Sequence, residues 1–147
     1  MSCHDIGRGM NSVIEVVIGL YDDGKISTES AGEIIKACRR GVHWCDGNEG
    51  EAVGPLAFTR CGVCLKKIPE GKELYDLVDA YGVEVEHTDC EKIFQKAQYE
   101  LAYPSVCGKC MDKIITEWTG NSEISSKIKK ALMEKYPEEC VSRKTRY

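Results

Sequence analysis

The sequence lacks three features that would assign a broad class at once: long apolar runs, an excess of positive charge and an evident catalytic motif. Its longest apolar runs are on the order of five residues, whereas a membrane-spanning helix needs about twenty. The residues after Met1 contain no continuous apolar segment like that of a secretion signal, and the formal net charge of the 147 residues is −4. We therefore expect no contact with a membrane, a cytoplasmic location, and no binding of nucleic acid through overall charge.

Histidine is also scarce, with three residues, while cysteine is abundant, with nine. In a cytoplasmic protein, cysteines are metal ligands or reactive thiols more often than members of a disulfide framework. Each histidine lies close to a cysteine, in the pairs Cys3 and His4, His43 and Cys45, and His87 and Cys90. This distribution indicates metal binding. Because no constellation of acid, base and nucleophile accompanies it, we expect that the protein is not an enzyme.

Two amphipathic helices are predicted in the first third of the chain. Apolar residues recur at helical spacing from 11 to 21, and Asp22-Asp23-Gly24 follows as a turn signal. A second apolar stripe begins near Ser30, which can form a capping box with Glu33, and Gly41 provides a C-terminal cap. These signals predict an N-terminal helical hairpin.

The segment from Val42 to Thr59 is rich in glycine and acidic residues, which is typical of a surface connection. We place a domain boundary within it. The expected organisation is a helical hairpin with its linker at 1–54, a zinc-binding module at 55–121, and a C-terminal helix with a basic tail at 122–147.

Three pairs of candidate ligands, each separated by two residues, follow this linker: Cys61 and Cys64, His87 and Cys90, and Cys107 and Cys110. Thiolate and neutral imidazole suit tetrahedral Zn²⁺, and a gap of two residues lets one tight turn direct both side chains at a single ion. Gly62 gives the first pair the freedom for such a turn. The pattern predicts one or two zinc ions per chain.

Short strands and a helix are predicted between these pairs. The segments 73–78 and 83–87 have strand patterns and are joined by a short turn, which predicts a β-hairpin. Thr88 or Asp89 can cap the helix that follows, so Cys90 lies in its first turn.

This order of a Cys-x2-Cys turn, a hairpin and a helix that begins with ligands resembles the treble-clef zinc fingers of the LIM and poly(ADP-ribose) polymerase type over residues 60–95. The resemblance implies one structural zinc ion held by Cys61, Cys64, His87 and Cys90. It does not imply DNA binding, because eight acidic residues and one lysine lie between Glu70 and Glu91.

The same region resembles, more weakly, the layout of HNH nucleases, in which two Cys-x2-Cys pairs hold zinc and a histidine activates water. That resemblance implies a catalytic His87 and a zinc site made by Cys61, Cys64, Cys107 and Cys110. Met111 stands where that family commonly has a final histidine, and no asparagine occurs between His87 and Cys110. The partner of the first cysteine pair therefore stays open. An iron–sulfur cluster and a redox dithiol are further uses of the same cysteines.

A second metal site is expected if the first one uses His87 and Cys90, because Cys107 and Cys110 then need other partners. Cys38 and Cys45 are the best candidates, since a shared site would clip the helical hairpin to the metal module. The alternatives are His43, Cys3 with His4, and Cys140.

A last helix is predicted between Ser122, as its cap, and Pro137. Basic residues cover its exposed side and continue in the tail: Lys127, Lys129, Lys130, Lys135, Arg143, Lys144 and Arg146. This is the most basic surface of the chain, where a nucleic acid or an acidic partner would bind.

The fold expected from these elements is α+β and mainly helical, with an N-terminal helical hairpin, a treble-clef zinc module containing a small β-hairpin, and C-terminal helices. We expect a non-enzymatic zinc-binding regulatory or adaptor protein that acts through protein–protein interaction. The alternative is a nucleic-acid-associated zinc protein, with an HNH-like nuclease using His87 as its least favoured form.

Overall fold

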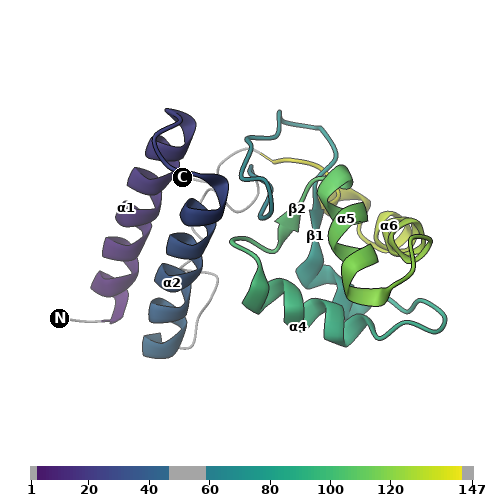
Figure 1. Ribbon diagram of the computed structural model, residues 1–147. Coiled ribbons are helices and arrows are strands. Elements are labelled where there is room, and N and C mark those ends of the chain that lie inside the picture. The colour runs from purple at the N-terminus through teal and green to yellow at the C-terminus, as the bar shows by residue number, and fades with distance from the viewer. Residues whose placement is uncertain (1–2, 47–58, 144–147) are drawn as a thin grey trace. The chain divides into compact units, whose positions relative to one another are not determined.

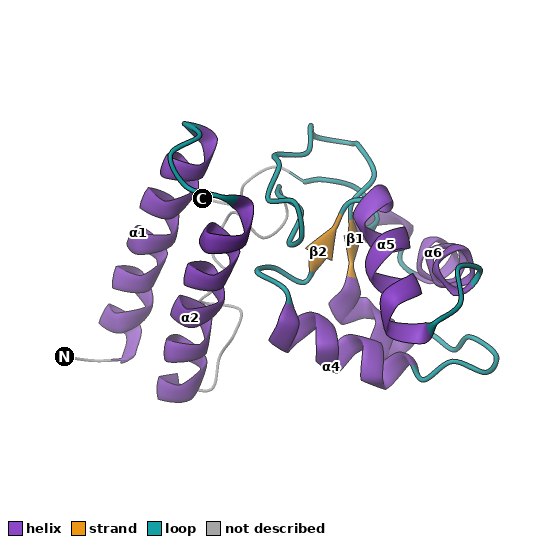
Figure 2. Ribbon diagram, in the orientation of Figure 1, coloured by secondary structure: helices purple, strands orange, loops and turns teal. Residues whose placement is uncertain are grey.

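The computed structural model describes residues 3–46 and 59–143, with side chains described at 9–40 and 59–143. The chain forms two compact units, Met1–Leu56 and Ala57–Tyr147. Each unit has its own architecture, and together they make a mainly helical α+β protein (Figure 2).

The first unit is an antiparallel pair of helices, α1 (Cys3–Asp22) and α2 (Thr28–Asp46) (Figure 1). Gly24 adopts a positive φ of 72° in the turn between them, where only glycine is free of strain. Ser27 caps α2, because its side-chain oxygen accepts a hydrogen bond from the Ser30 amide at 3.0 Å. The cap therefore lies three residues before the predicted one.

Apolar side chains of both helices meet in the hairpin, as the predicted stripes require. The buried members are Ile14, Val17, Ile18, Ala31, Ile35 and Cys38. These residues recur at helical spacing, so the periodicity of the sequence defines the packed side of each helix.

The second unit contains three longer helices: α4 (Cys90–Glu100), α5 (Gly108–Thr119) and α6 (Ile124–Lys135). Short 3₁₀ segments, η2 (Leu77–Gly82) and η3 (Pro137–Glu139), complete the helical part. Asp89 caps α4 by accepting a hydrogen bond from the Lys92 amide at 3.1 Å. Gly120 ends α5 in the left-handed conformation, with φ of 72°.

The sheet of this unit has two strands, β1 (Tyr75–Asp76) and β2 (Ser105–Val106), paired antiparallel with Tyr75 opposite Val106. The predicted hairpin between 73–78 and 83–87 is wrong. Asp76 accepts a hydrogen bond from the Val78 amide at 3.1 Å, and this cap starts η2 where the strand was expected to continue. The chain then passes through 83–87 without forming a strand.

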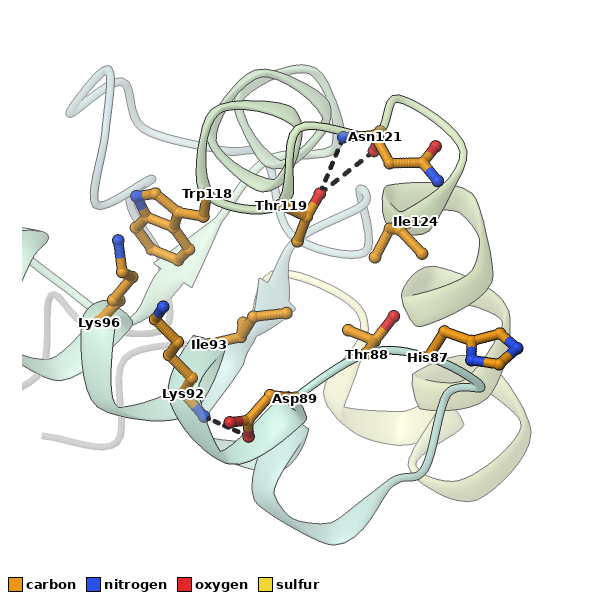
Figure 3. Close-up of a pocket in the computed structure, with 10 residues that line it drawn as sticks. All are labelled: His87, Thr88, Asp89, Lys92, Ile93, Lys96, Trp118, Thr119, Asn121 and Ile124. Atoms are coloured by element: carbon orange, nitrogen blue, oxygen red, sulfur yellow. Dashed lines mark hydrogen bonds between the residues drawn. The ribbon is translucent and has the colours of Figure 1, made fainter.

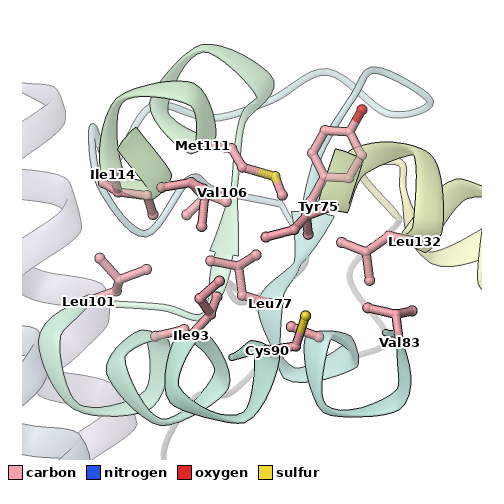
Figure 4. Packing of buried hydrophobic residues seen from close by; sticks show 14 of the residues in the cluster. Tyr75, Leu77, Val83, Cys90, Ile93, Leu101, Val106, Met111, Ile114 and Leu132 are labelled. Carbon is pink, nitrogen blue, oxygen red and sulfur yellow. The ribbon is translucent and has the colours of Figure 1, made fainter. Parts of the chain in front are cut away.

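The core of the second unit is built by residues from α4, α5, α6 and η2, together with both strands (Figure 4). Leu77, Ile93 and Val106 lie at its centre with Met111 of α5, and α6 adds Leu132. Helix α6 buries its apolar side in this shared core through Ile124, Ile128 and Leu132. None of the helices in the described residues is long and apolar enough to span a membrane.

Candidate metal centre

The first cysteine pair lies in a tight turn closed by an antiparallel bridge between Arg60 and Lys67. The Leu65 amide donates to the Cys61 carbonyl at 3.0 Å, and the Cys61 amide donates to the Lys66 carbonyl at 3.2 Å. Leu65 has a positive φ of 62°, which turns the chain back on itself. This compact loop, here called the knuckle, directs Cys61 and Cys64 to one side.

The second pair begins helix α5. Cys107 is its N-cap residue, with extended backbone (φ −70°, ψ 158°), and Cys110 lies in the first turn. Unpaired amides and the positive end of the helix dipole favour negative charge at this position. The helix start therefore favours the thiolate form that a metal ion requires.

The structure brings these two pairs together. The four sulfur atoms of Cys61, Cys64, Cys107 and Cys110 all lie within 4.8 Å of one another. In a tetrahedral Zn–S₄ site with bonds of about 2.3 Å, the sulfur atoms are about 3.8 Å apart. The cluster thus needs only a small contraction to enclose one ion. It is consistent with a zinc finger.

Backbone amides surround the most buried sulfur. Cys61 is fully buried, and its sulfur accepts hydrogen bonds from the Val63 amide at 3.4 Å and the Cys107 amide at 3.3 Å. Such N–H···S bonds offset the negative charge of metal-bound thiolates and orient them. One amide comes from the knuckle and the other from α5, so Cys61 couples both halves of the site.

Thiol pKa values in the cluster differ with the surroundings of each sulfur. Burial raises the pKa of Cys61 to about 11, against the opposing effect of the amides that donate to it. Burial also raises the pKa of Cys110, and the neighbouring sulfurs add to this rise. At Cys107 burial acts the same way, but hydrogen bonds from the Cys110 amide and from the other thiols outweigh it and lower the pKa. Without a positive ion, a thiolate at Cys61 or Cys110 is therefore disfavoured by burial and by the neighbouring sulfurs.

A close backbone approach fixes the knuckle against the segment before β2. A Cβ atom on Gly62 would lie 1.7 Å from the carbonyl oxygen of Tyr103. The Gly62 amide donates to the Ser105 carbonyl, and the Ala102 amide donates to the Gly62 carbonyl at 3.2 Å. Glycine at this position is thus needed for the contact between two distant segments, in addition to the turn that the sequence indicated.

Two residues beside the cysteines hold this contact and were not predicted from the sequence. The Ser105 hydroxyl donates to the Arg60 carbonyl at 2.9 Å. The Arg60 guanidinium donates to the Leu65 carbonyl at 3.0 Å, and its side chain is buried. Their only signal in the sequence is adjacency to the ligand pairs, which does not reveal the pairing.

The structure does not bring His87 and Cys90 to the cluster. The His87 side chain is 87% exposed, and its Nε2 lies 3.2 Å from a Glu86 carboxylate oxygen. The Cys90 side chain points into the apolar core near Val83 (Figure 4), where burial raises its pKa. Cys90 belongs to the buried side of α4 with Ile93, which explains why its sulfur faces away from the knuckle. Among the described residues, the ligand set is therefore the alternative one, with Cys107 and Cys110.

The hairpin cysteines are not required to complete this set. Cys38 is a buried member of the α2 stripe, and burial raises its pKa. The predictions for Cys45, His43, Cys3 and His4 fall on side chains outside those described. Cys140 is buried in the second unit and donates to the Tyr136 carbonyl at 3.3 Å.

The four cysteines thus form a group that can hold a metal ion, assembled from two turns far apart in the sequence. No protein-family model matches the chain, and no curated protein or solved structure matches it either.

Proposed function

We propose that this chain is a non-enzymatic regulatory or adaptor protein, stabilised by one structural zinc ion, that acts by binding another protein. The observation that carries the proposal is the complete four-cysteine set. Four thiolates saturate a tetrahedral ion and leave no position for water or substrate, which is typical of structural sites and not of catalytic ones.

The arrangement around the cysteines supports a treble-clef module, in a form different from the expected one. A knuckle with two ligands precedes a two-stranded sheet, and the helix that follows β2 supplies the other two ligands. In this interpretation the ligand-bearing helix is α5. Helix α4 is then an insertion between the two strands.

Zinc suits the spacing of the cluster better than a multinuclear iron–sulfur centre. Four sulfur atoms within 4.8 Å of one another enclose a single ion, whereas a four-iron cluster holds its cysteine sulfurs farther apart. Tetrahedral sulfur sites in proteins bind zinc or iron, so metal analysis distinguishes the two.

An exposed apolar stripe on α1 supports the protein-binding part of the proposal. Val13, Val16 and Leu20 occupy one side of the helix and are 44%, 63% and 37% exposed. Residues at this spacing anchor a helix in an apolar groove of a partner. We infer that the partner presents an apolar groove or helix to this stripe.

The basic surface of α6 gives less support to a nucleic-acid partner. Lys129 lies 2.8 Å from an Asp112 carboxylate oxygen, and Lys135 donates to the Gly82 carbonyl. Arg143 pairs with Asp76 at 3.9 Å. Because these charges are engaged within the unit, a smaller part of the expected basic surface is available to phosphates.

Metal analysis of the purified protein tests the structural part. We expect one zinc ion per chain, lost in Cys64→Ser and retained in His87→Ala and Cys90→Ala. The last two variants are matched controls, because they remove the ligands that the sequence favoured. Iron in place of zinc, or full metal in Cys64→Ser, would contradict the proposal.

A pull-down from native extract tests the interaction. We expect a stoichiometric protein partner that Val16→Glu releases, since a charge in the apolar stripe is costly to bury. Ala37→Glu is the control, as it places the same charge at an exposed position of α2. Capture of nucleic acid alone, or of no partner, would argue against the adaptor role.

A further inference from the structure

A hollow separate from the metal centre lies between the first half of α4 and the turn from α5 to α6 (Figure 3). Its volume is about 280 Å³, near the lower limit of ligand pockets, about 300 Å³. The residues that line it are His87, Thr88, Asp89, Lys92, Ile93, Lys96, Trp118, Thr119, Asn121 and Ile124. None of the four clustered cysteines is among them.

The inner surface of the hollow is apolar and aromatic. Ile93 and Ile124 are buried members of the core, so their position is fixed by packing. The Trp118 indole is partly buried and forms one wall (Figure 3). An indole face in such a wall is a stacking surface for a planar ring.

Two lysines supply positive charge beside this wall. The Lys96 ammonium lies 5.7 Å from the centroid of the Trp118 ring, a cation–π distance. Neither Lys92 nor Lys96 forms an ion pair with a carboxylate in the described part of the chain. The nearby Asp89 carboxylate accepts a hydrogen bond from the Lys92 amide and serves as the helix cap. Two ammonium groups therefore face the hollow against one carboxylate that is already bonded.

The opposite rim is polar and uncharged. The Asn121 side-chain oxygen accepts a hydrogen bond from the Glu123 amide at 2.9 Å, and the side chain points away from Trp118 and the two lysines (Figure 3). The hydroxyl of Thr119 donates to the Ile115 carbonyl at 2.7 Å and accepts from the Asn121 amide at 3.3 Å, so one lone pair remains as an acceptor. This rim therefore offers one acceptor, at Thr119, to a donor of a heterocyclic ring.

We propose that this hollow binds a nucleoside monophosphate, with the base against Trp118 and the phosphate between Lys92 and Lys96. Two ammonium groups match the two negative charges of a terminal phosphate, which lysines bind as point charges. The volume restricts the ligand to a single nucleotide. The inference is independent of the proposed protein partner, and it does not involve the metal ligands.

Tryptophan fluorescence provides a direct test, because the chain has only two tryptophans, Trp44 and Trp118. In a Trp44→Phe background, Trp118 is the sole reporter. We expect saturable quenching by adenosine 5′-monophosphate or another of the four common nucleoside monophosphates. Adenosine and inorganic phosphate, used as the separate fragments, are each expected to bind at least tenfold more weakly, since each lacks half of the contacts.

Matched double variants separate this site from general charge attraction. Lys92→Gln with Lys96→Gln is expected to weaken nucleotide binding at least tenfold. Lys113→Gln with Lys130→Gln removes the same charge from exposed positions outside the hollow and is expected to leave binding unchanged. Circular dichroism and metal content, expected to be unchanged in both, show that the fold persists.

The inference would be overturned by the absence of saturable quenching by any nucleoside monophosphate at millimolar concentration, by equal weakening in the control pair, or by adenosine binding as tight as that of the monophosphate. A response to a single-stranded oligonucleotide but not to free nucleotides would also overturn it, in favour of a nucleic-acid surface. If the protein proves not to bind zinc, this test still applies, because it measures the fluorescence of Trp118.

Discussion

The two units of this chain reach a stable fold by different means. The helical hairpin joins neighbours in the sequence through a short turn, and its buried residues follow one helical period. The C-terminal unit instead joins the knuckle at Cys61 to the start of α5 at Cys107, and pairs β1 with β2 across the whole of α4. Contacts over long sequence separations cost more chain entropy, and the four-cysteine cluster lies where this cost arises. The four-cysteine group that can hold a metal ion therefore lies in the unit that depends on distant contacts.

Removal of the metal is expected to have the largest effect, and only on the C-terminal unit. Structural zinc contributes a free energy comparable to the stability of a whole domain, about 5–15 kcal/mol. A chelator should therefore expose Trp118, measured as a red shift of its fluorescence in Trp44→Phe. If the chelator leaves the fluorescence spectrum unchanged, the apolar core keeps the unit folded without metal.

Gly62→Ala should destabilise the C-terminal unit by about 3 kcal/mol or more, because an added Cβ overlaps backbone atoms that cannot move aside cheaply. The clash is with the Tyr103 carbonyl oxygen, at 1.7 Å. Thermal unfolding with excess zinc measures the loss, and competition with a chelator should show weaker metal binding. A midpoint equal to that of the wild type would mean that the knuckle does not pack against 102–105.

The C-terminal unit is also expected to lose stability as the pH rises. Burial, a hydrogen bond with Glu139 and the negative charge of Asp76 raise the pKa of Asp79 from 3.8 to about 8. The folded state therefore keeps a proton that the unfolded chain releases above pH 3.8, so this contribution to stability is complete at low pH and is lost as the pH rises toward about 8.

Asp79→Asn isolates this contribution, since the amide stays neutral. At fixed zinc concentration, the difference in unfolding free energy between Asp79→Asn and the wild type should grow in favour of the variant between pH 5 and 8. The pH dependence of metal binding by the cysteines is common to both proteins and cancels. A constant difference across that range would show that Asp79 titrates normally.

Gly32→Ala should have the smallest effect, of opposite sign, in the hairpin. A Cβ atom at Gly32 meets nothing within 4 Å, and alanine in a helix interior is favoured over glycine by about 0.5–1 kcal/mol. Thermal unfolding of the hairpin should shift upward while metal content stays the same. The two variants compare a glycine without distant contacts, Gly32, with a glycine that is needed for a distant backbone contact, Gly62.

Helices α1, α2, α4 and α6 could be predicted from periodicity and end signals, because those signals depend on residues within one or two turns. Asp89 is an example, since its side chain caps the start of α4. The strand at 83–87 was wrong for a related reason. Alternating valine and glutamate give a segment one apolar side to bury, and this pattern favours a strand. Val83 is indeed buried, but the described part of the chain contains no strand that pairs with this segment.

The sequence by itself determined that cysteine pairs with metal-ligand spacing are present and that helices carry or follow them. Only the tertiary structure decided that Cys61 and Cys64 meet Cys107 and Cys110, while Cys90 turns into the core and His87 into solvent. The spacing of each pair is a local property of one turn. Which pairs meet depends on the path of the chain between them, and here that path is set by the close backbone contact between Gly62 and Tyr103.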